Sequence, residues 1–186
     1  MTNAVPALDV HFGHSHLKRP DTTGRFVVVI DVLRASTTIT TALHHGARAV
    51  WAVAESADAR RVARTVGRAT SVLGGERNAE RIAGFDLGNS PREYRASIVA
   101  GKSVVTTTTN GTRAILAGRR GASRLVVGSF VNFSVVLREL TAALRAGTSV
   151  AVICAGSEGQ FSLEDAVCAG RFVRRAVVSV ANSRAH

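Results

Sequence analysis

Short apolar runs rich in valine recur along the chain and alternate with stretches whose apolar residues have helical spacing. Such runs are typical of buried strands. The predicted strands cover residues 26–30, 49–54, 71–73, 103–106, 125–127 and 149–154. The predicted helices cover 36–45, 56–66, 111–117, a segment opened by Ser90-Pro91, and two later stretches around 133–144 and 163–177. This alternation predicts an α/β fold, a three-layer α/β/α sandwich with a largely parallel or mixed sheet.

Length and hydropathy predict one globular domain over residues 1–186. The chain has 186 residues, of which 46% are hydrophobic, so a sizeable core is expected. No apolar run reaches the roughly 18 residues of a membrane span, and the first ten residues lack the pattern of a secretion signal. We therefore expect a cytoplasmic protein with no membrane partner.

The formal net charge of +11 comes mostly from arginine and indicates an anionic partner. The arginines are scattered, and aromatic residues make up only 5% of the chain, so platforms for stacking nucleic-acid bases are scarce. We expect no nucleic acid and favour a small phosphorylated substrate. A basic solvated surface explains most of the arginines, and a homodimer is left open.

Polar residues follow several predicted strands, at the sheet edge where open α/β folds bind ligands. Asp31 follows the first strand. Residues 74–91 form a long, charged, glycine-rich segment that contains Glu76, Arg77 and Asp86, and loops of this length are often functional. Because these strand ends converge, they indicate one site.

The stretch Thr109–Arg113 combines a turn-forming Asn110-Gly111 pair with the predicted start of a helix. Free N–H groups at a helix start attract anions. Thr109, Asn110, Gly111, Thr112 and Arg113 are therefore candidate phosphate-binding residues. The alternative is a plain turn with a helix cap.

Asp31 can act as a nucleophile or as a metal ligand, while Arg34, Ser36 and Thr37 can hold phosphate oxygens. The alternative is that Asp31 only caps the following helix. Glu164 and Asp165 begin the last predicted helix and can join Asp31 in binding Mg²⁺, which prefers oxygen ligands. They can equally complement the helix dipole.

Two further features have both a chemical and a structural interpretation. Cys154 ends a strand and can serve as a thiol nucleophile in a hydrolase, but an inert buried cysteine is favoured. His11, His14 and His16 alternate and can bind a metal, but a polar, partly ordered N-terminal segment is favoured.

Six stretches occur in the order seen in 2-phosphosulfolactate phosphatases, and the chain resembles that family over about residues 26–173. They are VVVIDVLRASTTITTAL, GGERN, GFDLGNSPREY, GKSVVTTTTNGTRA, VVGSFVN and FSLEDAVCAG. The long matches make the resemblance specific. At Ala79 the family tends to have glycine. Family members continue for several tens of residues beyond the last stretch, so the chain is expected to lack the C-terminal part of the family fold.

The resemblance implies a magnesium-dependent phosphatase that converts 2-phosphosulfolactate to sulfolactate and phosphate, a step of coenzyme M biosynthesis. In this interpretation Asp31, Glu164 and Asp165 bind the metal, and Arg34, Asn110, Thr112 and Arg113 hold the phosphate. Arg77 receives the carboxylate or sulfonate. Glu76 or Asp86 accepts a proton from the attacking water. The alternatives are an anion-binding module without turnover and a hydrolase based on Cys154.

Overall fold

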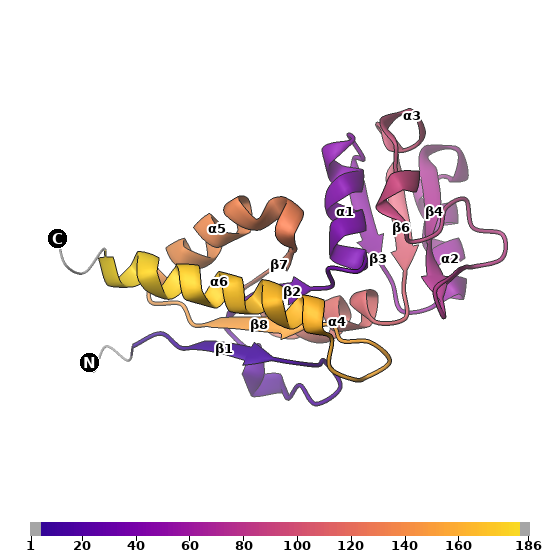
Figure 1. Cartoon of the computed structure of the whole chain (residues 1–186). Helices are drawn as coiled ribbons and strands as arrows, with labels where there is room; N and C mark the ends of the chain where they lie inside the picture. Colours follow the sequence, from indigo (N-terminus) through magenta and orange to yellow (C-terminus); the bar gives the residue numbers. More distant parts are fainter. Residues whose placement is uncertain (1–4, 183–186) are drawn as a thin grey trace.

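A computed structural model describes residues 5–182 as two β-sheets with helices packed on both faces of each (Figure 1). The strands are β1 (Leu8–His11), β2 (Phe26–Ile30), β3 (Ala49–Ala52), β4 (Ser71–Arg77), β5 (Glu80–Arg81), β6 (Ser103–Thr107), β7 (Arg124–Gly128) and β8 (Val150–Cys154). The α-helices are α1 (Ala35–His44), α2 (Ser56–Val66), α3 (Ala96–Val99), α4 (Gly111–Gly118), α5 (Phe133–Arg145) and α6 (Leu163–Asn182). Single 3₁₀ turns are η1 (Arg19–Asp21), η2 (Arg68–Thr70), η3 (Pro91–Glu93) and η4 (Phe130–Asn132).

The first sheet is parallel, with strand order β1-β8-β2-β7. Its central strand β2 is buried along its whole length because both faces are covered. Val28 and its neighbours on one face pack against α5 and α6. Val27 and Val29 on the other face pack against Ala114 of α4. The alternation of side chains along a strand explains why a run of valines fits between two helical layers.

The second sheet has strand order β3-β6-β4-β5, in which only β5 is antiparallel. Val104 and Val72 face Ala42 of α1 and the segment around α3. Val105 on the opposite face packs with Ala59 and other residues of α2. Helices α1 and α4 contact strands of both sheets and lie between them. The predicted α/β fold class is confirmed, with the strands divided between two sheets rather than gathered in one.

The N-terminal segment is more ordered than the sequence suggests. Residues 8–11 form β1, which pairs in parallel with β8, so His11 belongs to a strand, whereas His14 and His16 lie in the loop that follows. His14 Nδ1 lies 3.1 Å from the carbonyl oxygen of Ala155, which ties the following loop to the end of β8. Two of the four residues of β1, Asp9 and His11, are polar, so the strand contains no apolar run that would predict it.

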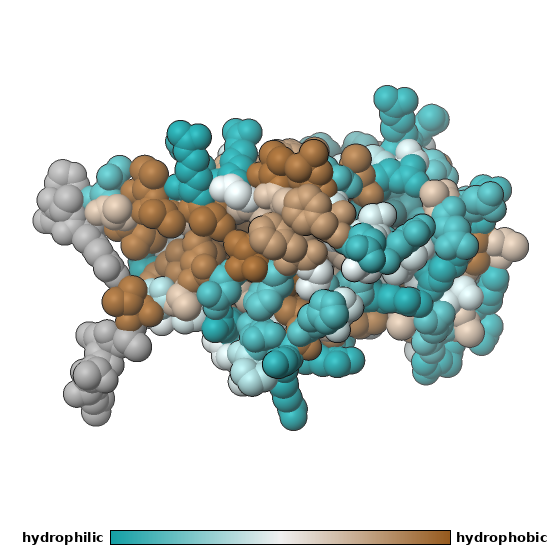
Figure 2. Space-filling model, turned by 60° about the horizontal axis from the view of Figure 1, so that its bottom comes forward, coloured by the Kyte–Doolittle hydropathy of each residue, from teal (hydrophilic) through white to brown (hydrophobic). Residues whose placement is uncertain are grey.

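Helix α6 covers the first sheet with one face and exposes apolar side chains on another (Figure 2). Leu163, Val167 and Val177 are each more than half exposed. Although α6 has 20 residues, no helix within residues 5–182 is long and apolar enough to cross a membrane.

Candidate active site

The carboxyl ends of strands from both sheets meet around one pocket with a volume of about 230 Å³. β2 and β8 belong to the first sheet, and β4 and β6 to the second. The ends of these strands and the loops beyond them supply the lining, namely Asp31, Leu33, Arg34, Glu76, Asn78, Ala79, Asn89, Thr109, Asn110, Ser157 and Glu158. The pocket therefore lies between the carboxyl-end edges of the two sheets. Its lining comes from residues that are far apart in the sequence.

Asp31 is one of the two buried carboxyl groups that line this pocket, with 7% of the residue exposed against 8% for Glu76. Its Oδ1 accepts a hydrogen bond from the backbone N–H of Ala35 at 3.0 Å, so the aspartate also satisfies the first free N–H group of α1. Burial, the nearby negative charge of Asp165 and that of Glu76 raise the pKa of Asp31 to about 7. The carboxyl group is therefore poised to gain or lose a proton, or to bind a cation, near neutral pH.

Gly111 allows the start of α4 to approach Asp31 closely. A Cβ atom at this position would lie 2.4 Å from Asp31 Oδ2 and 2.4 Å from the Cβ of Ala35. The adjacent Asn110 lines the pocket, and its Oδ1 accepts a hydrogen bond from the backbone N–H of Glu158 at 3.1 Å. The positive end of the α4 dipole therefore lies next to the buried carboxyl group.

Glu76 holds two loops of the pocket together. Its carboxylate accepts hydrogen bonds from Thr109 N at 2.7 Å, Thr109 Oγ1 at 3.0 Å and Ala79 N at 2.9 Å. Asn78 and Ala79 form the two-residue turn between β4 and β5, with φ of 52° and 65°. A turn of this kind needs positive φ at both positions and favours glycine, so Ala79 is strained there.

Asp165 lies beside the pocket rather than in its lining. Its two carboxylate oxygens accept hydrogen bonds from Val32 N at 2.8 Å and Gly156 N at 3.2 Å. It thereby joins the loops that follow β2 and β8. Glu164 is also outside the lining. Within residues 5–182, no three or more His, Cys, Asp and Glu side chains are grouped to hold a metal ion, so the predicted set of Asp31, Glu164 and Asp165 is not assembled.

Two arginines predicted to bind substrate make other contacts. Arg77 donates hydrogen bonds to the carbonyl oxygen of Ala54 at 2.7 Å and to Thr107 Oγ1 at 2.9 Å. Arg113 lies 3.7 Å from Glu55 in an exposed ion pair. Neither lines the pocket. Arg34 is the predicted arginine that does, because it sits between the end of β2 and the start of α1.

Three hydroxyl side chains that were predicted to bind substrate form hydrogen bonds within the protein instead. Ser36 Oγ accepts a hydrogen bond from the Asp31 backbone N–H at 3.0 Å, and Thr37 Oγ1 donates one to the Val32 carbonyl at 2.7 Å. Thr112 is buried and exchanges hydrogen bonds with Thr108. These hydroxyls shape the loops of the site and are absent from its lining.

Asp86 and Cys154 lie outside the pocket as well. The Asp86 carboxylate accepts hydrogen bonds from Leu73 N at 2.8 Å and from Arg68 at 2.6 Å, so it supports the second sheet instead of facing Asp31. Cys154 is 1% exposed, and burial followed by the charge of Asp165 raises the pKa of its thiol to about 12. A buried thiol with this pKa is a poor nucleophile.

Asn89 is a pocket residue that the sequence analysis missed. It is 6% exposed, and its Oδ1 is buried with no hydrogen-bond partner among the described residues. Buried polar atoms are nearly always satisfied, so this oxygen is available to accept a hydrogen bond or to contact a cation in the pocket. Leu33, Asn78, Ser157 and Glu158 were also missed, because no repeated pattern marks loop residues that line a pocket.

Comparison with known proteins identifies the family. Residues 13–183 match the profile described as 2-phosphosulpholactate phosphatase. The chain belongs to this family. It is 50% identical over 147 residues to a probable 2-phosphosulfolactate phosphatase of Symbiobacterium thermophilum, an alignment that covers 79% of the chain and 61% of the relative.

Two further relatives carry the same name. The protein of Caldanaerobacter subterraneus subsp. tengcongensis is 44% identical over 144 residues, which cover 77% of the chain and 58% of the relative. That of Clostridium novyi is 39% identical over 166 residues, which cover 89% of the chain and 68% of the relative. The chain therefore spans about three fifths of the length of the first two curated relatives.

Proposed function

We propose that this protein is a magnesium-dependent phosphatase that hydrolyses 2-phosphosulfolactate to sulfolactate and phosphate. The observation that carries the proposal is the pocket in which the buried carboxyl group of Asp31 lies against the start of α4, since a Gly111 Cβ would be only 2.4 Å from Asp31 Oδ2. A carboxylate beside a helix N-terminus can bind a cation and a phosphate together. Membership of the family supports the reaction class and the substrate.

The donor atoms of the pocket fit a magnesium ion that keeps several waters. Asp31 supplies a carboxylate, and the unpartnered Asn89 Oδ1 supplies a carbonyl oxygen. Magnesium is often held by one or two protein oxygens together with substrate phosphate, so a cage of three carboxylates is not needed. When bound, the ion supplies positive charge that neutralises phosphate oxygens. Glu164 and Asp165 as direct ligands stay a prediction.

The protein's own groups for holding the phosphate lie at the start of α4 and on the loop after β2. Arg34 lines the pocket and offers a charge-assisted hydrogen bond. Asn110 and Thr109 border the same space. The α4 dipole adds positive potential where negative charge develops as the phosphate ester is cleaved.

In the proposed hydrolysis, a water attacks phosphorus and loses its proton to a carboxylate of the pocket. Glu76 is the candidate acceptor because it lines the pocket, whereas Asp86 contacts Leu73 and Arg68 instead. Three hydrogen bonds fix the Glu76 carboxylate and keep it oriented. The P–O bond to the sulfolactate oxygen breaks, and that oxygen takes up the proton that Glu76 accepted from the water, so Glu76 is a carboxylate again at the end of the reaction.

The assay is phosphate release from 2-phosphosulfolactate by the purified chain. We expect release with magnesium, loss of release with a chelator, and recovery when magnesium is returned in excess. The alternative, an anion-binding module without turnover, predicts binding of the same compound by calorimetry but no phosphate over a long incubation. That combination, with saturating magnesium, would contradict the proposal.

The cellular setting is a further part of the proposal. The family resemblance supports a role in coenzyme M biosynthesis, and we propose that the reaction takes place in the cytoplasm. We also propose that a homodimer, if one forms, leaves the pocket at Asp31 open to substrate. Fractionation and size-exclusion chromatography with light scattering test these points.

A further inference from the structure

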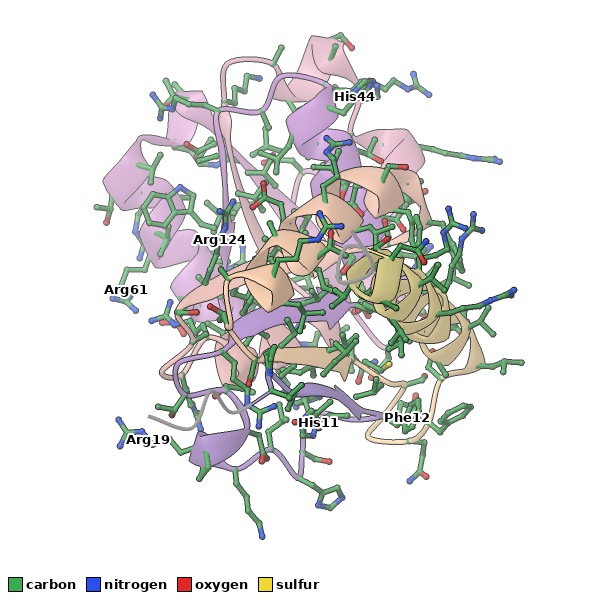
Figure 3. The ribbon with its side chains drawn as sticks, turned by 90° about the vertical axis from the view of Figure 1, so that its left-hand side faces the viewer. His11, Phe12, Arg19, His44, Arg61 and Arg124 are labelled. Carbon is green, nitrogen blue, oxygen red and sulfur yellow. The ribbon has the colours of Figure 1, made fainter. Side chains whose placement is uncertain are left out.

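A second concave surface runs along α4, apart from the pocket at Asp31. Its volume is about 870 Å³. We call it the basic groove, because its charged lining is entirely positive or histidine: His14, Lys18, Arg19, Arg113, Arg119 and Arg120. Figure 3 shows Arg19 extending outward from the η1 segment, away from the sheet. The groove has no role in the proposed hydrolysis.

The two walls of the groove are distant in sequence but firmly connected. One wall is the segment around η1, and the other is α4 with the turn that follows it. Thr22 Oγ1 donates a hydrogen bond to the Arg120 carbonyl at 2.6 Å, and Gly24 N donates one to the Gly121 carbonyl at 2.8 Å. These hydrogen bonds hold the two backbone segments at a fixed separation, so the walls that carry the cationic side chains are in place before a ligand binds.

Most of the cationic side chains of the groove have no ion-pair partner, although the Asp21 carboxylate on the η1 wall accepts a hydrogen bond from the Lys18 backbone N–H at 2.7 Å. Arg113 lies 3.7 Å from Glu55. Within residues 5–182, Lys18, Arg19 and Arg119 form no ion pair, and the same holds for Arg120. Like charges that converge repel one another, so an anion bound between the two walls is stabilised by all of them.

We propose that the basic groove binds a small anion that carries several linked phosphate groups. Its volume is in the range of about 300–1,000 Å³ that small-molecule sites occupy. Cations on two walls match charges spread along a ligand better than a single phosphate. No Phe, Tyr or Trp lines the groove, so it offers no stacking platform for nucleic-acid bases.

A second arginine-rich surface, on α5 and α6, provides the matched control. It includes Arg138, Arg171, Arg174 and Arg175. The guanidinium of Arg171 already lies 4.8 Å from the centre of the Phe133 ring. Removing two arginines there changes the net charge by the same amount as removing two from the groove.

The probe is inorganic tripolyphosphate, titrated by calorimetry into the whole chain with a chelator present and no magnesium. We expect saturable one-to-one binding that weakens as salt rises from about 50 to about 200 mM. The double variant Arg119→Ala/Arg120→Ala should bind about tenfold or more weakly, because two charge-assisted contacts are lost. Arg174→Ala/Arg175→Ala and Arg34→Ala should each stay within about threefold of the unmodified chain.

Each other outcome overturns the proposal. Equal losses in the two double variants would mean that net charge alone attracts the probe. A loss in Arg34→Ala would place the probe in the pocket at Asp31, and an absence of saturable binding would leave no site. Tighter binding of a single-stranded oligonucleotide through the same arginines would replace the small polyphosphate with nucleic acid. Melting curves of all variants verify that they fold, and none of these results depends on phosphatase activity.

Discussion

Replacing Asp31 with asparagine is expected to stabilise the unliganded protein at pH 8 and to do so much less at pH 5. Burial and neighbouring acids raise the pKa of Asp31 from 3.8 to about 7 in the folded chain. The folded state therefore binds this proton more tightly than the unfolded state, and stability falls as pH rises from about 4 to about 7. A difference of about 3 pH units, at about 1.4 kcal/mol each, corresponds to a cost of about 4 kcal/mol at pH 8.

The assay is urea unfolding of both proteins at the two pH values. At pH 5 only about 1.5–2 kcal/mol of the cost is present, so the stability advantage of Asp31→Asn should grow by roughly 2–3 kcal/mol between pH 5 and pH 8. Asp58→Asn, an exposed change on α2, should alter stability by less than about 1 kcal/mol at both pH values. An advantage of Asp31→Asn that is the same at both pH values would refute the reasoning.

Three further changes follow from particular contacts. Gly111→Ala should cost about 1–3 kcal/mol of stability and lower phosphate release at least about tenfold, because its Cβ would meet Asp31. Gly170→Ala, whose Cβ would have no atom within 4 Å outside its own helix, should gain up to about 1 kcal/mol of stability with normal activity. Equal behaviour of the two variants would contradict this account. Ala79→Gly should raise the free energy of unfolding by about 0.5–1 kcal/mol by relieving positive φ, and a lower urea midpoint would argue against strain. Cys154→Ala should retain phosphate release, and alkylation of the folded protein should leave the buried thiol unmodified; inactivation on alkylation of that thiol would instead favour a thiol enzyme.

Much of the fold could be predicted because its strands are unusually apolar. The run at β2 and the helical spacing along α5 and α6 each depend on residues close together in sequence. The division into two sheets could not be predicted, because it depends on which strands pair across long distances. β1 was missed because two of its four residues are polar and it contains no apolar run.

The site was predictable where polar residues lie at or just beyond the carboxyl end of a strand. Five residues found in this way line the pocket, namely Asp31, Arg34, Glu76, Thr109 and Asn110. Sequence position does not reveal side-chain direction, however. Arg77 and Arg113, both predicted to bind substrate, lie outside the pocket lining and contact Ala54 and Glu55. Asn89 gave no signal, because its importance comes from an oxygen left without a partner after folding.

The most direct measurement of the central claim is a crystal grown with manganese in place of magnesium, together with phosphate, and recorded at a wavelength where manganese scatters anomalously. The account predicts an anomalous peak at direct coordination distance from an Asp31 carboxylate oxygen, with the phosphate beside the start of α4. A fully occupied ion elsewhere on the chain, with the pocket at Asp31 holding neither metal nor phosphate, would contradict it.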